Sequence, residues 1–191
     1  VYNSEGVQYK EPQLKIMGLQ MVKSSTPAII RTKLKESLPT ILYGTESDVQ
    51  QYVLKFKEEF MKLKPEEIAF PRSINDLETY KDVSSIYKKA TPIHVRGALL
   101  YNHYVKACEL TSKYQLIQAG DKIKFLYLRV PNILAEDCVS FVDQLPPEFE
   151  LTSDVDYHKM FEKTFEDAVQ NILDALGWST TAKASLDDMF A

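Results

Sequence analysis

The sequence contains little of what metalloproteins, secreted proteins and membrane proteins require. It has only two cysteines, Cys108 and Cys138, which lie far apart and lack the C-x-x-C spacing of zinc or redox sites. We therefore expect both to be buried, reduced thiols. No apolar run is long enough to span a bilayer, and no basic segment followed by an apolar one resembles a secretory signal. These absences predict a protein with an ordinary hydrophobic core and no membrane partner.

The side chains that catalysis usually needs are not grouped in this sequence. There is no glycine-rich phosphate loop and no nucleophile elbow. The three histidines, His94, His103 and His158, have no second ligand at metal-binding spacing. Residues 43–47 (Tyr-Gly-Thr-Glu-Ser) suggest a metal-binding turn, but such a turn needs two carboxylates and only Glu46 is available. We interpret this segment as the cap of a helix, and we expect no metal and no cofactor in this chain.

The net charge of −4 conceals an uneven distribution along the chain. Residues 10–36 carry six bases and two acids, and residues 81–129 carry nine bases and three acids. Residues 136–191 carry thirteen acids and three bases. Two basic blocks and an acidic end are typical of a protein with one surface that faces a polyanion. Solvated helix faces scattered around a fold produce the same counts, so the counts alone leave both interpretations open.

Hydrophobic periodicity predicts a mainly helical chain. Helices are predicted over residues 27–38, 45–63, 92–110 and from Asp154 or Asp156 to Gly177. The first should end at Pro39, because proline cannot donate a backbone hydrogen bond. The second and fourth helices carry apolar stripes, made of Val49, Tyr52, Val53, Phe56, Phe60 and Leu63 and of Met160, Phe161, Phe165, Val169, Ile172, Leu173 and Leu176.

Strands are predicted to be few and short. They are expected as a hairpin over residues 1–9 and as single strands at 14–17, 68–70, 122–130 and 139–142. Pro71 should cut the strand at 68–70, and the last two strands should pair. Residues 72–91 are polar and irregular, with room for one helical turn. Together with the helices, these strands predict an α+β, mainly helical fold.

One cluster of polar residues is suited to a phosphate group. Ser24, Ser25 and Thr26 stand at a predicted helix start, with Lys15 and Lys23 before them. Hydroxyls and free backbone N–H groups at a helix start, together with lysine, favour an anion. Helix capping alone would explain the hydroxyls, but it would not explain the two lysines.

A second cluster lies on the helix predicted over residues 92–110. Arg96 and Lys106 are placed to hold phosphates, while Tyr101 and Asn102 would reach toward a groove. An ordinary amphipathic helix with Tyr101 in the core fits the same pattern. The pattern does not choose between the two interpretations.

The last residues of the chain combine acidic and apolar side chains. Leu186, Met189 and Phe190 are three and four residues apart, so a single helical turn would place them on one face. A partner protein would supply the pocket that such a terminus lacks. Alternatively, the terminus folds back onto its own core.

Four segments in the same order resemble T-even-type phage DNA polymerases, which are replicative family-B enzymes. Residues 9–19 and 23–27 (Lys-Ser-Ser-Thr-Pro) are similar to the sequence that follows the catalytic palm motifs of that family. Residues 93–102, which begin Ile-His-Val-Arg-Gly, are similar to a thumb helix. Residues 161–165 resemble the last thumb helix, and residues 183–190 resemble the sliding-clamp-binding tail. The resemblance implies the C-terminal part of such a polymerase, which fits a chain that begins at Val1.

The resemblance also implies a domain organisation and a role. Residues 1–26 would end the palm as a short β-rich arm, residues 27–177 would form the thumb, and residues 178–191 would be a flexible tail. The thumb would grip primer–template duplex DNA, and the tail would tether the enzyme to the sliding clamp during replication in the cytoplasm of an infected bacterial host. The aspartates that hold two Mg²⁺ ions would lie in the parent palm, outside this chain. This part alone is therefore expected not to polymerise without the remainder of the chain.

Site residues follow from the resemblance position by position. It implies DNA contacts from Lys15, Lys23, Ser24, Ser25 and Thr26 near the primer end, from Arg96, Gly97, Tyr101 and Asn102 along the backbone and minor groove, and from Lys122, Lys124 and Lys163. It implies clamp contacts from Leu186, Met189 and Phe190. One departure is Asp167, because the family tends to carry a basic residue there, one turn after Lys163. The competing hypothesis is a helical protein-interaction module with a C-terminal docking peptide and no nucleic-acid binding.

Overall fold

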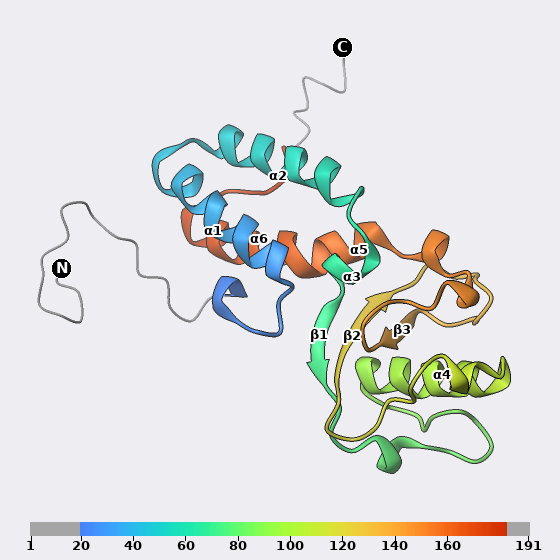
Figure 1. Cartoon of the computed structure of the whole chain (residues 1–191). Helices are drawn as coiled ribbons and strands as arrows, with labels where there is room; N and C mark the ends of the chain where they lie inside the picture. Colours follow the sequence, from blue (N-terminus) through green and yellow to red (C-terminus); the bar gives the residue numbers. More distant parts are fainter. Residues whose placement is uncertain (1–19, 183–191) are drawn as a thin grey trace, which may run out of the picture.

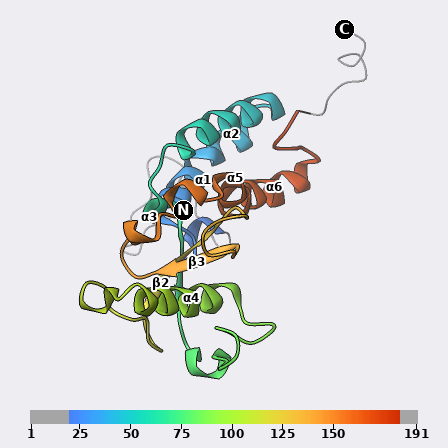
Figure 2. The same ribbon diagram turned by 90° about the vertical axis from the view of Figure 1, so that its right-hand side faces the viewer.

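Two helical layers enclose a small sheet in the computed structural model, which describes residues 20–182. The predicted hairpin, the strand at 14–17 and the terminal motif lie outside these described residues. Helices α1, α2, α5 and α6 form one layer, and α4 lies on the other side of the sheet (Figures 1 and 2). This arrangement confirms the predicted α+β, mainly helical fold. None of the helices in the described part is long and apolar enough to cross a membrane.

The elements follow one another in a simple order. The longer helices are α1 (Ala28–Tyr43), α2 (Glu46–Phe60), α4 (Ile93–Ala107), α5 (Tyr157–Phe161) and α6 (Asp167–Leu173), with the short α3 at Pro65–Ile68. The strands are β1 (Phe70–Ser73), β2 (Lys122–Tyr127) and β3 (Cys138–Phe141). Single turns are η1 (Gln20–Val22), η2 (Leu77–Tyr80), η3 (Leu110–Ser112), η4 (Pro147–Phe149), η5 (Thr152–Asp154), η6 (Glu162–Glu166) and η7 (Asp174–Leu176).

Aromatic side chains hold the first helical layer together. Phe56 of α2 lies 4.7 Å from Phe165 and 5.8 Å from Phe161, measured between ring centroids. Phe60, one turn later on α2, lies 5.2 Å from Phe161. These four rings are buried, and edge-to-face or tilted pairs of this kind stabilise beyond their buried area. The apolar stripes predicted for α2 and for the last helix therefore form the core of this layer, except for Leu176, which is 49% exposed because the helix ends at Gly177.

Helix ends are set by local side-chain chemistry. Thr45 caps α2 through a capping box, in which its hydroxyl accepts from the Asp48 N–H and the Asp48 carboxylate accepts from the Thr45 N–H at 2.8 Å. Asp156 caps α5 by accepting from the Lys159 N–H at 3.0 Å. Gly177, at φ +69°, ends the last helix in the left-handed conformation. All three boundaries agree with the prediction, although the π-helical turn η6 inside the last helix was not predicted.

The sheet is antiparallel in the order β1-β2-β3. Leu126 of β2 pairs with Val139 of β3, which confirms the predicted pairing of these strands. Phe70 of β1 pairs with Phe125 of β2, and their rings stack with centroids 5.0 Å apart. Helix α4 packs directly on β3, so the sheet lies between two helical layers (Figure 2).

Two prolines and one cysteine correct the predictions. Pro39 lies inside α1 and does not end it, because the flanking Leu38 and Ile41 are both buried and their packing offsets the lost hydrogen bond. Pro71 lies inside β1, where it is tolerated because β1 is an edge strand. Cys138 is buried as expected, but Cys108 is exposed at the end of α4.

The segment after the last helix is fastened to both α2 and α6. The Ser179 N–H donates to Glu46 Oε1 at 2.7 Å, and the Ser179 carbonyl accepts from the Gln50 side chain at 3.1 Å. The Gln170 side chain of α6 accepts from the Thr180 N–H at 3.0 Å and donates to the Trp178 carbonyl at 3.0 Å. With the bonds from the Thr180 hydroxyl to Glu166 Oε1 at 3.2 Å and from the Trp178 N–H to the Leu173 carbonyl at 3.1 Å, six hydrogen bonds attach residues 178–180 to the helical layer.

Candidate nucleic-acid interface

The turn Ser24–Thr26 precedes the longest helix of the fold. Pro27 occupies the N-cap position of α1, so the helix begins at Ala28, one residue later than predicted. No side chain caps the helix. Helix α1 is 16 residues long, so its first N–H groups and its dipole present partial positive charge next to this turn. The turn is therefore placed where an anion is favoured, and its surroundings decide whether one can bind.

A hollow of about 390 Å³ opens beside this turn. We call it the Arg72 hollow. Its lining includes the acidic Asp167 that follows η6, and its other polar lining residues include Ser25, Thr26, Arg72, His94, Tyr127 and Lys163. These residues come from the turn, β1, α4, β2 and η6, so the fold brings together five segments that are far apart in sequence. Ser25, Thr26 and Lys163 were predicted from the sequence, whereas Arg72 was not.

Arg72 is held firmly in the wall of the hollow. Its Nη1 donates to the Ser25 carbonyl at 2.7 Å and to the Pro71 carbonyl at 2.9 Å. Its guanidinium lies 5.3 Å from the ring centroid of Phe70 and 5.6 Å from that of Phe125. Burial lowers the pKa of Arg72 from its usual value, although arginine stays charged at any physiological pH. No acidic side chain among residues 20–182 forms an ion pair with it.

The other ionisable groups of the hollow contribute less positive charge. Burial, with Arg72 nearby, lowers the pKa of His94 from its ordinary value, so His94 is neutral at pH 7. Lys163 is charged, and the hydrogen bonds that it donates to Glu162 and then to Asp167 raise its pKa. Its Nζ lies 2.7 Å from Glu162 and 3.1 Å from Asp167, so two carboxylates balance its charge. Arg72 is consequently the main uncompensated cation in the lining.

Further bases surround the same turn. Lys122 and Arg72 line an adjoining hollow of about 380 Å³ together with Ser24 and Ser25. On the other side, Arg31 and Lys124 line a broader depression of about 690 Å³ together with Ser24 and Thr26. We call the turn with Arg31, Arg72, Lys122 and Lys124 the basic turn surface.

Two of these bases, Arg31 and Lys124, differ in the hydrogen bonds that their side chains make. The Arg31 Nε is buried and has no hydrogen-bond partner within the described chain. The Lys124 ammonium donates to the Glu66 carbonyl at 3.1 Å, and Glu66 and Glu67 also line the broader depression. Lys23 stands apart from this group and lines a smaller hollow of about 200 Å³ with Asn171.

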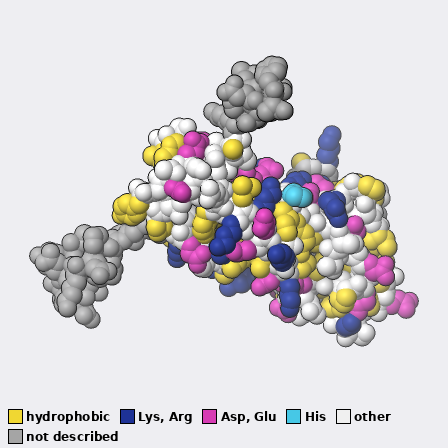
Figure 3. Space-filling model, turned by 90° about the horizontal axis from the view of Figure 1, so that it is seen from above, with side chains coloured by type: hydrophobic (Ala, Val, Ile, Leu, Met, Phe, Trp, Pro, Cys, Tyr) yellow, Lys and Arg dark blue, Asp and Glu magenta, His cyan; other side chains and the backbone are white. Residues whose placement is uncertain are grey.

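Positive charge does not cover the protein evenly. On the face seen from above in Figure 3, lysine and arginine side chains lie beside aspartate and glutamate side chains and do not form one basic patch. On that face, the scattered-charge interpretation of the sequence blocks is correct. The convergence around Ser24–Thr26 is therefore a local feature of the fold.

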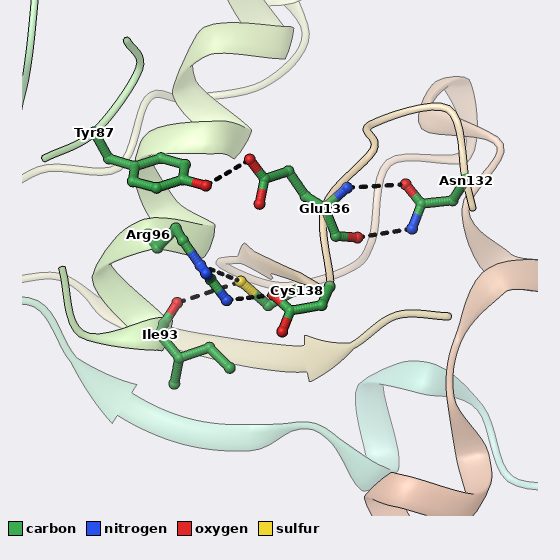
Figure 4. Close-up of polar contacts among 7 residues, drawn as sticks. Tyr87, Ile93, Arg96, Asn132, Glu136 and Cys138 are labelled. Carbon is green, nitrogen blue, oxygen red and sulfur yellow. Dashed lines mark hydrogen bonds and ion pairs between the residues drawn. The ribbon is translucent and has the colours of Figure 1, made fainter. Parts of the chain in front are cut away.

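Arg96 belongs to a polar cluster inside the α4–β3 contact (Figure 4). Its guanidinium pairs with Asp137, its Nε donates to Cys138 Sγ at 3.3 Å, and it lies 5.7 Å from the Tyr87 ring centroid. The Tyr87 hydroxyl donates to Glu136 at 2.6 Å. Burial raises the pKa of the Cys138 thiol to about 11, so this sulfur is a packed thiol in contact with the guanidinium. Arg96 thus joins α4, β3 and the loop that carries Tyr87.

The other predicted residues of α4 also have partners within the protein. A Cβ atom on Gly97 would lie 2.5 Å from Ser140 Oγ, so glycine permits the close approach of α4 to β3. Tyr101 is 3% exposed and its hydroxyl donates to the Gln115 carbonyl at 3.4 Å, which agrees with the core interpretation. Asn102 bonds both the N–H and the carbonyl of Ile117 at 2.8 Å. Lys15, Leu186, Met189 and Phe190 lie outside the described residues.

Comparison with known proteins adds an independent observation. No protein-family model matches the chain. The whole chain aligns over 194 residues with the DNA-directed DNA polymerase of Enterobacteria phage T4, at 32% identity, and with that of Escherichia phage RB69, at 34%. Over its whole length, the chain is related to part of a T4-type phage DNA polymerase. It spans about one fifth of the length of these relatives, 21% in each case.

This relationship to T4-type polymerases confirms the resemblance drawn from the sequence and is consistent with a C-terminal part of such an enzyme. In residues 20–182 no group of three His, Cys, Asp or Glu side chains is placed to hold a metal ion.

Sequence reasoning missed two members of the basic turn surface. Arg31 was counted only as part of a basic block, and Arg72 stood in a segment expected to be irregular. No spacing rule links Arg72 to Ser25, because 47 positions separate them and only strand β1 brings them together. The Pro71-Arg72 pair at a short strand was the sole local signal for this position.

Proposed function

We propose that this chain is the thumb-containing C-terminal part of a T4-type DNA polymerase and that it grips primer–template duplex DNA through backbone phosphates. The convergence of Arg31, Arg72, Lys122 and Lys124 around the Ser24–Thr26 turn carries this proposal. Cations and a helix N-terminus recognise phosphate without reading sequence, as a replicative enzyme requires. The chain acts without catalysing, and the parent palm supplies the aspartates and two Mg²⁺ ions for nucleotidyl transfer.

The roles of the remaining predicted residues follow from their surroundings. Lys163 lines the Arg72 hollow but is balanced by two acids, and Lys23 would add positive charge from the separate, smaller hollow that it lines. Arg96, Gly97, Tyr101 and Asn102 would position α4 and β3 beneath the basic turn surface, because their described contacts are internal. Holding the primer end in place would let the distant palm perform the chemistry.

Duplex affinity of the 191-residue chain should fall steeply with salt. Each neutralised phosphate contributes about 0.9 to the slope of log K against log salt. The double variant Lys122→Gln/Lys124→Gln should reduce that slope by roughly 1–2. Fluorescence anisotropy with a labelled primer–template duplex, between low and moderate salt, measures both quantities.

A matched control uses two exposed lysines, Lys55 of α2 and Lys62 in the turn after that helix. Lys55→Gln/Lys62→Gln removes the same charge from positions that do not line the basic turn surface, so its slope should stay near that of the unaltered chain. Equal slopes in the two double variants would reject the proposed surface. No duplex binding at low salt would reject the DNA function altogether and would favour a helical protein-interaction module.

The terminal motif gives a separate proposal, in which Leu186, Met189 and Phe190 enter an apolar pocket on the sliding clamp. Burying three such side chains is worth roughly 4–8 kcal/mol before ordering costs. Changing all three to alanine should therefore weaken clamp binding by at least about a hundredfold, even after ordering costs are subtracted. Isothermal calorimetry with the clamp of the parent replication system measures this, with Ser185→Ala as control. Clamp affinity that survives deletion of residues 184–191 would exclude the tail as the tether.

A further inference from the structure

The geometry points to Arg72 as a preorganised phosphate-binding residue, with the free edge of its guanidinium available to one phosphate in the Arg72 hollow. This inference rests on the proposed DNA function and names a residue that neither the sequence motifs nor the resemblance assigns. The ligand chemistry is a phosphate monoanion, supplied by a nucleic-acid backbone or by a free phosphate.

Hydrogen bonding leaves one edge of the guanidinium free. The two N–H groups of Nη1 are used by the carbonyls of Ser25 and Pro71. Nε and Nη2 have no hydrogen-bond partner within residues 20–182. These two atoms carry the parallel N–H groups with which arginine makes bidentate bonds to phosphate. The fixed half of the side chain thus orients the free half.

Aromatic rings fix the plane of the same group. Phe70 and Phe125 face each other across β1 and β2, and the Arg72 guanidinium lies within 5.6 Å of both ring centroids. An arginine held on an aromatic surface loses little conformational freedom when it binds a ligand. The side chain is half-buried, so a phosphate there would interact through less water than at an exposed lysine.

The positive charge of Arg72 is available to one bound anion. Arg72 has no acidic partner in the described chain, whereas Lys163 is balanced by Glu162 and Asp167. The hollow of about 390 Å³ far exceeds the ~30 Å³ that one water occupies in the liquid, so a phosphate and several waters fit. The Ser25 hydroxyl lines the same space and can donate to a further phosphate oxygen, whereas the hydroxyl of the buried Thr26 donates to Gln20 Oε1 at 3.5 Å.

Substitutions at Arg72 separate charge from geometry. Arg72→Gln should weaken duplex binding about tenfold and reduce the salt slope by about 0.9, because a bidentate charged contact is lost. Arg72→Lys should keep the slope but weaken binding about threefold, because a single ammonium cannot form the parallel pair. Arg129→Gln is the control, since Arg129 is exposed, bonds the Ser153 carbonyl and does not line the hollow. Duplexes with 5′-hydroxyl ends restrict the assay to backbone phosphodiesters.

A second measurement uses the unaltered chain and does not depend on a variant that folds. The Arg72 Nε–H resonance, assigned by its loss in Arg72→Lys, is followed by ¹H–¹⁵N NMR during titration with inorganic phosphate and, separately, with sodium chloride at equal ionic strength. A saturable shift with phosphate alone supports the site.

The outcomes distinguish this inference from the proposed function. Duplex binding with equal affinity and slope in Arg72→Gln overturns the inference and leaves the DNA function standing. If the unaltered chain binds no duplex, the DNA function fails. The phosphate titration then decides: a specific Nε shift supports a site for free phosphate, and its absence overturns the inference.

Discussion

Replacing Phe56 by alanine should lower the free energy of unfolding by about 3–5 kcal/mol, the range for a buried phenylalanine. Phe56 is 2% exposed and contacts the rings of Phe60, Phe161 and Phe165. It therefore joins α2 to α5 and η6 of the last helix. Alanine would leave a cavity that the surrounding buried rings fill only in part, because a close-packed interior relaxes little.

Urea unfolding followed by circular dichroism measures this effect. Leu54→Ala is the control, because Leu54 lies on the same helix but is 60% exposed, and its loss should change stability by no more than about 0.5 kcal/mol. A loss below about 1 kcal/mol for Phe56→Ala would mean that the aromatic cluster does not unite the helical layer.

The second large effect is expected at Gly97, where helix α4 meets strand β3. Alanine would place its Cβ 2.5 Å from Ser140 Oγ, 2.7 Å from the Ser140 backbone nitrogen and 2.9 Å from the Val139 carbonyl carbon. The hydroxyl can rotate away, but the strand backbone cannot. Overpacking costs about 1–3 kcal/mol, and the three contacts below 3.0 Å favour the upper end of that range. The gain in helix propensity is about 1 kcal/mol, so Gly97→Ala should destabilise by about 2 kcal/mol.

A double variant tests whether the strand backbone is responsible. Ser140→Ala combined with Gly97→Ala removes the hydroxyl contact but keeps the contact with the backbone nitrogen, so it should recover less than half of the lost stability. Lys106→Ala, at an exposed position of α4, should be nearly neutral. If Gly97→Ala proved as stable as the unaltered chain, the helix and strand would be further apart than described.

Features governed by neighbours in sequence were predictable. Thr45 and Asp156 cap helices because their side chains reach N–H groups within three residues, and Gly177 ends a helix because it adopts positive φ without strain. The apolar stripe through Phe56 was equally predictable, because the spacing of its residues alone shows which face of the helix is buried.

Features set by tertiary contacts were not predictable. Pro39 is a local helix breaker, and only burial on both sides of it keeps α1 intact. The sequence predicted Arg96 as a phosphate ligand. Its guanidinium instead bonds Asp137 and Cys138, which lie at the start of β3 about forty residues further along the chain. The sequence assigned no role to Arg72, because the proposed role depends on the Ser25 carbonyl, which β1 brings near.

The hydrogen bonds at residues 178–180 have a mechanical consequence. They attach the chain to α2 through Glu46 and Gln50 and to the last helix through Glu166 and Gln170, and no strand takes part. A pulling force applied at residue 182 would therefore load two helices side by side. Because Lys163, Asp167 and Asn171 of the last helix also line the Arg72 hollow, that tension would reach one wall of the hollow proposed to hold a phosphate.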